Sequence, residues 1–300
     1  MIIEWTLGSK KVDIKKLVIE NLGESKGNQL LEKTGPKFLQ HANENEDSLS
    51  LGVLALKNLL VKLSKKNVDL NSLESLISVS ESPKKQIPGN SFDYISLCNL
   101  HDHIFPIDIN AGCTGFVDAL RIANSLKKPS IIITSETYSK RIDGFARNIT
   151  PIFADGASAT YFNPNQWTTL YESSTIRKST SAAISCVNSL GLTMNGPEVV
   201  DFVMGEVVTD IEKIIKKFQP SYVFAHQGSK FVVDFMKSKL ANDKVLFPEN
   251  IMEVGNTVSS TLPILFDQVT KASKLKPKTR VLFTGFGVGL SHSAMLLEVN

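Results

Sequence analysis

The chain has 300 residues, of which 42% are hydrophobic and 21% are charged, and its formal net charge is +3. This length allows one large domain or two medium domains with a substantial core. The small net charge with scattered lysine pairs argues against a nucleic-acid-binding surface, and no apolar run approaches the ~20 residues that a membrane span needs.

Short β-rich runs alternate with amphipathic stretches in the first half of the chain, which is typical of an α/β protein. The spacing of leucines predicts a helix over 47–63, and apolar runs predict buried strands over 75–80, 104–109 and 130–135. A turn at Asp155 then enters a strand that ends at Phe162. Turn formers gather at 163–166, so we expect a boundary there between an N-terminal half, 1–165, and a C-terminal half, 166–300.

The second half begins with a new strand near Thr168 and contains the clearest helix of the chain, over 197–218. A proline suits its first turn, and an apolar stripe of valines and isoleucines follows at helical spacing. The remaining pattern predicts strands over 222–225, 280–286 and 293–299 and helices over 229–240 and 257–275.

The most informative motif is Asn110-Ala111-Gly112-Cys113-Thr114-Gly115-Phe116, between the strand at 104–109 and a helix predicted over 116–127. A thiol at a helix start meets free backbone N–H groups that favour a thiolate, so Cys113 is a candidate nucleophile. The helix effect lowers a thiol pKa by at most about one and a half units, so a histidine and an oxyanion site would have to do the rest. The alternative is a small buried hydrophobic side chain.

Other polar residues occupy positions where a site could form. His226 follows an apolar strand and precedes a helix, as a site residue or as a cap of that strand end. Asn256 lies at a turn before a helix, where an amide needs no function. The loop at 285–289 is followed by a strand, so it fits an oxyanion-binding backbone or a tight turn better than a nucleotide loop. The pair of histidines at 101 and 103 has no third ligand, so no metal site is expected.

Location follows from the chain start and the cysteines. Met-Ile-Ile-Glu-Trp lacks the basic and apolar regions of a secretory signal. The three cysteines (Cys98, Cys113 and Cys186) form no paired framework. We therefore expect a cytoplasmic protein.

Taken together, these segments resemble the β-ketoacyl-acyl carrier protein synthase III type of condensing enzyme, within the thiolase superfamily. The resemblance spans most of the chain beyond about residue 30, and a Cys, His-Gln and Gly-Asn-Thr series at this spacing is fairly specific. The segments that carry it are Lys33-Thr34-Gly35, Asn110 to Phe116, Ile152-Phe153-Ala154-Asp155-Gly156-Ala157, Leu192-Thr193-Met194-Asn195-Gly196, His226-Gln227, Gly255-Asn256-Thr257 and Phe286-Gly287-Val288-Gly289.

The resemblance implies a five-layered α/β/α/β/α thiolase fold built from two similar halves, usually a homodimer. It implies that Cys113 takes an acyl group as a thioester from coenzyme A or acyl carrier protein, with no permanently bound cofactor. His226 and Asn256 would then stabilise the enolate formed when a malonyl-type extender loses carbon dioxide, in fatty-acid-like or specialised acyl metabolism. The backbone N–H groups of Cys113, Val288 and Gly289 would hold the tetrahedral oxyanion.

The chain departs from the family pattern at its substrate mouth. The family's adenine-stacking tryptophan falls near Gln29, and Lys33 replaces a neighbouring arginine, while Arg147 matches another mouth arginine. Gly228-Ser229-Lys230-Phe231 stands where the family commonly has Ala-Asn-x-Arg, and the stretch between Asp155 and His226 is short for the family. Ile87 matches a residue that reaches into the partner's acyl pocket.

Related chemistries remain open at this point. Thiolases use a second catalytic cysteine near the C-terminus, which is absent here. Hydroxymethylglutaryl synthases add a catalytic glutamate; Glu81 lies in that neighbourhood, where a solvated loop carboxylate is the simpler expectation. The alternatives are transfer of the Cys113-bound acyl group to a hydroxyl or amine, a cysteine hydrolase with the Cys…His…Asn order, and a non-catalytic partner subunit.

Overall fold

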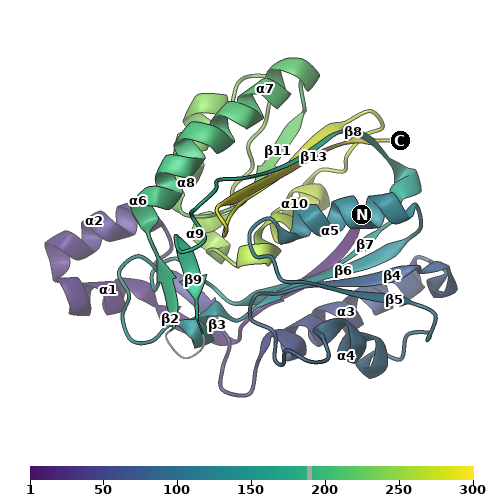
Figure 1. Cartoon of the computed structure of the whole chain (residues 1–300), viewed down its shortest axis with the longest axis horizontal. Helices are drawn as coiled ribbons and strands as arrows, with labels where there is room; N and C mark the ends of the chain where they lie inside the picture. The colour runs from purple at the N-terminus through teal and green to yellow at the C-terminus, as the bar shows by residue number, and fades with distance from the viewer. Residues whose placement is uncertain (188–190) are drawn as a thin grey trace.

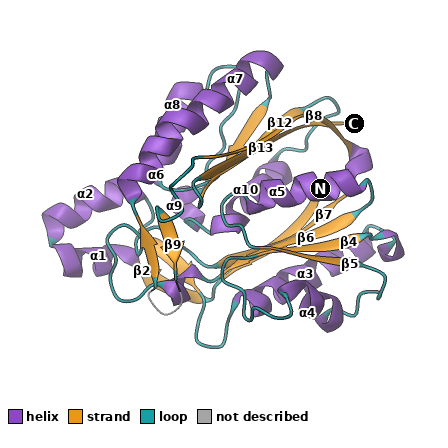
Figure 2. Cartoon of the chain, viewed as in Figure 1, coloured by secondary structure: helices purple, strands orange, loops and turns teal. Residues whose placement is uncertain are grey.

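The computed structural model describes residues 1–187 and 191–300, and its two main sheets lie on either side of a central pair of helices. The central helices are α5 (Gly115–Leu126) and α10 (Thr261–Ala272), which lie between the sheets in Figure 1. Further helices cover the outer faces of both sheets (Figure 2). The expected five-layered α/β/α/β/α arrangement is therefore confirmed.

The first sheet has the order β1-β7-β6-β4-β5, with β4, β5 and β6 parallel to one another and β7 antiparallel to its neighbours. Its outer face is covered by α3 (Ser48–Lys65), which begins with a capping box at Asp47, and by α4 (Asn90–Leu97). Its strands are β1 (Ile2–Leu7), β4 (Ser75–Val79), β5 (Phe105–Ile109), β6 (Ser130–Glu136) and β7 (Gly156–Phe162).

Strand β5 corrects one expectation, because it is an edge strand and is not fully buried. Phe105 exposes 55% of its side chain, while every residue of β4 and β6 is buried. An apolar run reveals a strand but does not say whether both of its edges are paired, and that distinction depends on sheet order.

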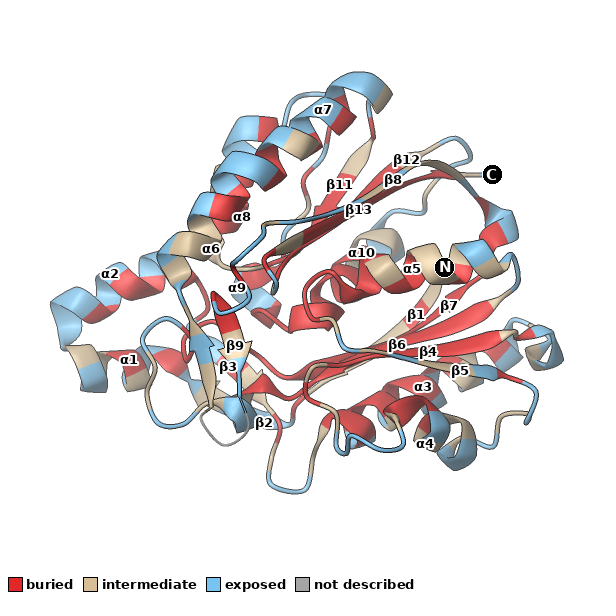
Figure 3. Cartoon of the chain, viewed as in Figure 1, coloured by how far each residue is buried: buried red, intermediate tan, exposed pale blue. Residues whose placement is uncertain are grey.

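The second sheet has the order β11-β12-β13-β8. Its strands are β8 (Trp167–Ile176), β11 (Tyr222–Ala225), β12 (Arg280–Gly287) and β13 (Ser291–Val299), and its outer helices are α7 (Val208–Phe218) and α8 (Lys230–Leu240). Between the sheets, Phe116 of α5 packs edge-on against Phe283 of β12, and both are fully buried. Burial of such a side chain contributes about 1.5–3 kcal/mol. Figure 3 shows the contrast between these buried central helices and the exposed outer faces of α7 and α8.

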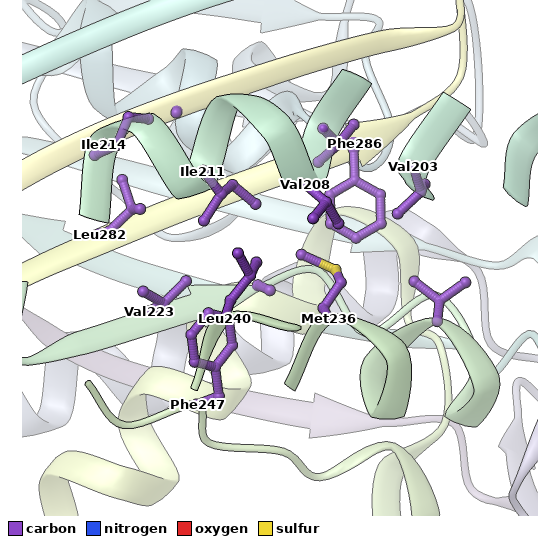
Figure 4. Close-up of a cluster of buried hydrophobic side chains, with 14 of the residues drawn as sticks. Val203, Val208, Ile211, Ile214, Val223, Met236, Leu240, Phe247, Leu282 and Phe286 are labelled. Atoms are coloured by element: carbon purple, nitrogen blue, oxygen red, sulfur yellow. The ribbon is translucent and has the colours of Figure 1, made fainter. Parts of the chain in front are cut away.

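The helix predicted over 197–218 is one continuous stretch with a π-helical turn inside it. It consists of α6 (Gly196–Phe202), the π turn at Val203–Val207 and α7. The predicted stripe is correct at Val203, Val207, Ile211 and Ile214, all of which are buried in the core cluster of the second sheet and α8. Figure 4 shows Val203, Ile211 and Ile214 in this cluster. A π turn often marks a functional position in a helix, and here Val203 lines the cavity described below.

Several small elements at the chain start and in the middle were not predicted. They are β1, β2 (Lys10–Asp13), α1 (Ile14–Leu22), α2 (Glu24–Thr34), β3 (Phe38–His41), α4, β9 (Ile184–Cys186), β10 (Leu192–Met194) and α9 (Ile251–Val254). The helices α1 and α2 pack on β3 through a small apolar cluster around Ile14 and Val18. Short elements carry too few periodic positions to stand out in a sequence. Within the described residues, no helix combines the length and the apolar character that a membrane crossing requires.

Candidate active site

Cys113 lies between β5 and α5, as the sequence predicts, and its side chain is only 6% exposed. The end of β12 packs directly against it. A Cβ added to Gly287 would lie 2.7 Å from the Cys113 sulfur, and one added to Gly285 would collide with the Cys113 carbonyl. Any residue other than glycine would displace the thiol, so these two glycines are there for close approach. The motif at 285–289 is therefore a packing surface for Cys113, formed by the end of β12 and the loop after it.

The charge around Cys113 differs from the expectation of a thiolate. Burial raises the pKa of the Cys113 thiol far above its ordinary value, and the carboxyl groups of Glu81 and Glu136 raise it further. The backbone N–H groups of Val288 and of Cys113 itself act in the opposite direction. Because desolvation outweighs these dipoles, the resting residue is a protonated thiol, and a base must take its proton when a substrate arrives.

His226 follows β11 directly and is 2% exposed. Burial lowers the pKa of its imidazole to about 3, so the ring is neutral at physiological pH. Its Nδ1 lies 2.7 Å from the hydroxyl of Thr261, and the ring meets Phe286 edge-on at 5.4 Å between centroids. Thr261 is a positioning residue that the sequence motifs did not reveal.

The hydroxyl of Thr261 can pair with either tautomer of His226. It lies 3.0 Å from the Val258 carbonyl, to which it can donate its single proton. In that orientation it accepts Nδ1–H from His226 and leaves Nε2 as a proton acceptor. When the hydroxyl proton points toward Nδ1 instead, Nδ1 accepts it. The ring proton is then on Nε2, which becomes a donor. One buried hydroxyl thus allows the imidazole to act as a base or as a hydrogen-bond donor.

Asn256 is held rigidly at a sharp turn. Its Oδ1 accepts the backbone N–H of Val258 at 2.8 Å, and its Nδ2 donates to the Gly228 carbonyl at 3.1 Å. Its own backbone pairs with Phe153, which ties it to the segment at 152–154. Val258 takes a φ of 55°, which is strained for a β-branched residue. The amide is thereby oriented, and its second N–H remains available to a ligand.

One cavity of about 410 Å³ brings most of the predicted residues together. Cys113, His226 and Asn256 line it, although they come from three separate loops of the chain. Lys33 and Arg147, both exposed, also line it and place two cations at its edge. Apolar side chains from α6, the π turn and α8 form its remaining wall, including Val199, Val200, Val203, Phe231 and Val232.

Three predicted residues, Ile87, Val288 and Gly289, do not line this cavity. Ile87 exposes 87% of its side chain in the loop before α4. The carbonyl of Gly289 lies 3.2 Å from the Thr180 hydroxyl. In this loop Gly287 lies against the Cys113 side chain, and Val288 directs its N–H to the sulfur.

Glu81 is a site residue that sequence reasoning undervalued, because a solvated loop carboxylate is not what the structure shows. Its side chain is partly buried and accepts hydrogen bonds from the Tyr138 hydroxyl and the Gly112 N–H, one residue from Cys113. Burial raises the pKa of the Glu81 carboxyl above its usual value. Its position directly after β4 was visible in the sequence, but its partner Tyr138 lies 57 residues away.

Behind Glu81 lies Glu136, the last residue of β6, which is completely buried. It accepts hydrogen bonds from the N–H groups of Glu81 and Ser82 and from the hydroxyls of Ser82 and Ser259. Burial, followed by the charge of Glu81, raises the pKa of Glu136 to about 8. Glu136 therefore joins the segment at 81–82 to the turn that carries Asn256.

Comparison with known proteins places this arrangement in a family. The sequence model of 3-oxoacyl-(acyl carrier protein) synthase III matches residues 107–178, and that of its C-terminal region matches residues 214–299, together just over half of the chain. A β-ketoacyl-(acyl carrier protein) synthase III of Clostridium novyi is 26% identical, with 96% of this chain and 94% of the relative covered.

Solved structures support the same fold. A 3-oxoacyl-(acyl carrier protein) synthase of Burkholderia xenovorans has a TM-score of 0.87 at 22% identity, covering 99% of this chain and 93% of that chain. A priming β-ketosynthase of a polyketide biosynthetic pathway has a TM-score of 0.85 at 19% identity, covering 99% and 95%.

Proposed function

The chain belongs to the 3-oxoacyl-(acyl carrier protein) synthase III family, and from that premise we propose that it is an acyltransferase that condenses two acyl thioesters. Cys113 takes an acyl group from coenzyme A or acyl carrier protein, and a malonyl-type thioester then extends it by decarboxylative condensation. The observation that carries this proposal is that Cys113, His226 and Asn256 line one cavity whose edge bears Lys33 and Arg147.

In the loading step, the Cys113 sulfur attacks the thioester carbonyl and the bond from that carbon to the donor sulfur breaks. Because the thiol is protonated at rest, its proton passes to Nε2 of neutral His226 and on to the departing thiolate. The oxyanion that forms in between accepts hydrogen bonds from the backbone N–H groups of Cys113 and the Val288 loop. No net charge is then left in the buried site.

In the condensation step, the extender loses carbon dioxide, and the electrons of that bond form an enolate. Its oxygen accepts the second N–H of Asn256 and the N–H of His226 in the tautomer with a protonated Nε2. The enolate carbon attacks the acyl carbonyl, the carbon–sulfur bond to Cys113 breaks, and the thiolate takes a proton from solvent. Neutral donors suit this step because they favour a charge that appears only in the transition state.

Lys33 and Arg147 serve the donor in this proposal. Both are exposed at the cavity edge, where the phosphates of coenzyme A or of a carrier's pantetheine arm would pass. The donor is thus a substrate, and the proposal includes no permanently bound cofactor. Free cysteines at 98, 113 and 186 fit the proposed cytoplasmic location.

We test the proposal with intact-mass analysis after incubation with a panel of acyl thioesters, followed by malonyl-CoA. Wild type should gain the mass of one acyl group and then release carbon dioxide and a β-ketoacyl thioester. Cys113→Ala should gain no acyl mass, whereas Cys98→Ala, which removes a half-buried thiol that does not line this cavity, should behave as wild type. Equal acylation of wild type and Cys113→Ala would reject covalent catalysis at Cys113, and acyl transfer without carbon dioxide would reject condensation.

The proposal includes a homodimer formed through β5. This edge strand exposes Phe105, and the adjoining α4 exposes Phe92 and Leu97, so apolar surface collects beside an unpaired strand edge. Ile87 protrudes in the loop before α4, as expected of a residue that reaches into the partner's acyl pocket. Light scattering should give twice the mass of one chain, and Phe105→Asp should lower it. A monomeric wild type would reject this part of the proposal.

A further inference from the structure

A second, smaller cavity adjoins the loop of Cys113. It has a volume of about 160 Å³ and includes Glu81, Asn110, Tyr138, Arg141 and Val288 in its lining. Asn110 opens the motif of Cys113, and Val288 is the residue whose N–H meets the Cys113 sulfur. An acyl group on Cys113 whose oxygen faces Val288 therefore has this cavity within reach of its chain.

The two cavities have different tasks. The larger one runs from Cys113 to the cations Lys33 and Arg147 and has an apolar wall, as the long arm of a thioester donor requires. The smaller one holds only a short group, because its volume is well below that of a typical ligand pocket of about 300–1,000 Å³. We assign the donor arm to the larger cavity and the acyl chain to the smaller one.

Apolar side chains, Ile184 and Leu192 among them, form part of the wall of the smaller cavity, and polar side chains form the rest. A plain alkyl chain would have to lie against that polar part as well. The Glu81 carboxyl accepts hydrogen bonds from the Tyr138 hydroxyl and the Gly112 N–H, so Tyr138 holds it in place. Within residues 1–187 and 191–300, Glu81 forms no ion pair, and Tyr138 is 4% exposed. Burying an alkyl chain here would leave a partly desolvated carboxyl without additional partners, which is unfavourable.

The charges of Glu81 and Arg141 determine which polar group on an acyl chain this cavity can bind. Arg141 lies at the exposed side of this cavity and forms no ion pair with the part of the chain that the structure describes. Its guanidinium disfavours an ammonium group on the acyl chain, while Glu81 disfavours a carboxylate. A neutral hydroxyl satisfies both, because it donates to Glu81 and accepts from Arg141 or from the Asn110 amide.

We propose that the acyl group loaded on Cys113 is a short hydroxyacyl group whose hydroxyl is bound between Glu81 and Arg141. This inference rests on the proposed function, since it names the substrate class of the same site. The hydroxyl takes no part in bond changes. The Cys113 sulfur forms the new thioester, the donor thiol leaves with the proton of Cys113, and the hydroxyl keeps its own proton.

The test is a competition between two donors of equal chain length, 3-hydroxybutyryl-CoA and butyryl-CoA, with the loaded mass on Cys113 as the readout. Wild type should prefer the hydroxyacyl donor by about tenfold or more in kcat/KM, the size expected for a hydrogen bond to a charged group. Glu81→Leu should bring the ratio to one or below. Glu81→Gln keeps the size and one acceptor oxygen, so it should retain part of the preference.

A ratio within one protein sample is insensitive to the fraction that is folded. Should Glu81→Leu not fold, Arg141→Leu at the exposed side should still reduce the ratio, whereas Lys140→Leu, the neighbouring cation that does not line this cavity, should leave it unchanged. A wild-type ratio of one or below would overturn the proposal, as would an unchanged ratio in Glu81→Leu or Arg141→Leu. Equal slowing of both donors by Glu81→Gln would overturn it too, because Glu81 would then act in the chemistry.

The same samples separate this inference from the proposed function. Carbon dioxide release after addition of malonyl-CoA reports condensation, while the loading ratio reports the acyl pocket. A hydroxyacyl preference without carbon dioxide release would reject the condensing reaction and keep the pocket assignment. Condensation with a preference for butyryl-CoA would keep the condensing reaction and reject the pocket assignment. No loading from either donor would reject both the condensing reaction and the pocket assignment.

Discussion

Cys113 and His226 each lie between the end of a strand and the start of a helix, but the groups that surround them differ. Cys113 lies between β5 and α5, and His226 lies between β11 and α8. Burial is the main cause of both pKa shifts, and only at the thiol do carboxyl groups, those of Glu81 and Glu136, add to it. Both pKa shifts keep the side chains uncharged, because the thiol holds its proton and the imidazole takes up no second proton.

This comparison separates the site from that of a cysteine hydrolase with a preformed thiolate–imidazolium pair. Such a pair needs a low thiol pKa and a high imidazole pKa, and here both are displaced in the other direction. Proton transfer is therefore coupled to the arrival of a thioester. The Cys…His…Asn order is shared with such hydrolases, but the fold and the charge states are not.

The largest effect is expected from removing the side chains of His226 and Asn256. Asn256→Ala should reduce condensation by about 10²–10³-fold, the usual cost of a lost oxyanion donor, while acyl loading continues. His226→Ala should reduce both steps, since the ring also carries the thiol proton. Intact mass measures loading, and carbon dioxide release measures condensation. Equal loss of both steps in Asn256→Ala would contradict its role as an enolate donor.

A second change acts on the Cys113 side through packing and through backbone strain, since Gly287 has a φ of 156°. Gly287→Ala would place a methyl group 2.7 Å from the sulfur and 2.9 Å from the Cβ of Cys113, so the thiol must move. We expect loading to fall about 10²-fold, because a displacement near 1 Å costs that much. Gly205→Ala is the matched control: no atom approaches the added Cβ within 4 Å, so activity should persist. Normal loading by Gly287→Ala would show that the sulfur position is not critical.

A smaller effect is expected from removing the Thr261 hydroxyl, which contacts Nδ1 of His226. Thr261→Val keeps the shape of the side chain but removes the partner of Nδ1 at 2.7 Å, so kcat for condensation should fall about tenfold, equivalent to a hydrogen bond of about 1–1.5 kcal/mol. Thr261→Ser restores the hydroxyl and should restore the rate. If Ser and Val variants were equally impaired, the effect would be one of packing rather than of proton position.

The last prediction concerns the stability of the fold and the carboxyl group behind Glu81, and no change in catalysis. Glu136 has a pKa of about 8 in the folded protein, above the ordinary 4.5, so its stabilising contribution is full below pH 4.5 and is lost as the pH rises through 8. Glu136→Gln lacks this loss, so its free energy of unfolding relative to wild type should improve from pH 5.5 to pH 8, by at most about 1.4 kcal/mol per pH unit.

Glu298→Gln is the control for that titration. Hydrogen bonds from Arg280 and Lys278 lower the pKa of Glu298, so its contribution is present above pH 4.5 and is lost only on further acidification. Its deficit relative to wild type should stay constant from pH 5.5 to pH 8. Chemical denaturation at several pH values measures both variants. A constant difference for Glu136→Gln as well would mean that Glu136 does not titrate in this window.

Sequence patterns captured the framework of the fold well where periodicity is strong. The strands at 75–80 and 130–135, the helices at 47–63 and 229–240 and the long helix after Pro197 all appear within a few residues of their predicted ends. The elements before residue 42, the strand β1 included, were not predicted, because they are short and offer few periodic positions. The division into halves at 165/166 remains a prediction.

The candidate site was predicted unevenly, and the reason is physical. Cys113, His226 and Asn256 stand in motifs of a few residues, which a sequence displays directly. Tyr138, Thr261 and Glu136 act through partners that are distant along the chain, such as Glu81 57 residues before Tyr138. No local pattern encodes such pairs.

By itself, the sequence determined which residues could react and which strands and helices would hold them, because residue type, turn chemistry and periodicity are local properties. Only the tertiary structure decided their protonation. Packing of β12 against Cys113 and of Phe286 against His226 removes water from both, and Tyr138 and Glu136 hold Glu81 beside the thiol. Desolvation depends on how distant segments meet, so the thiol remains protonated although a helix start favours the thiolate.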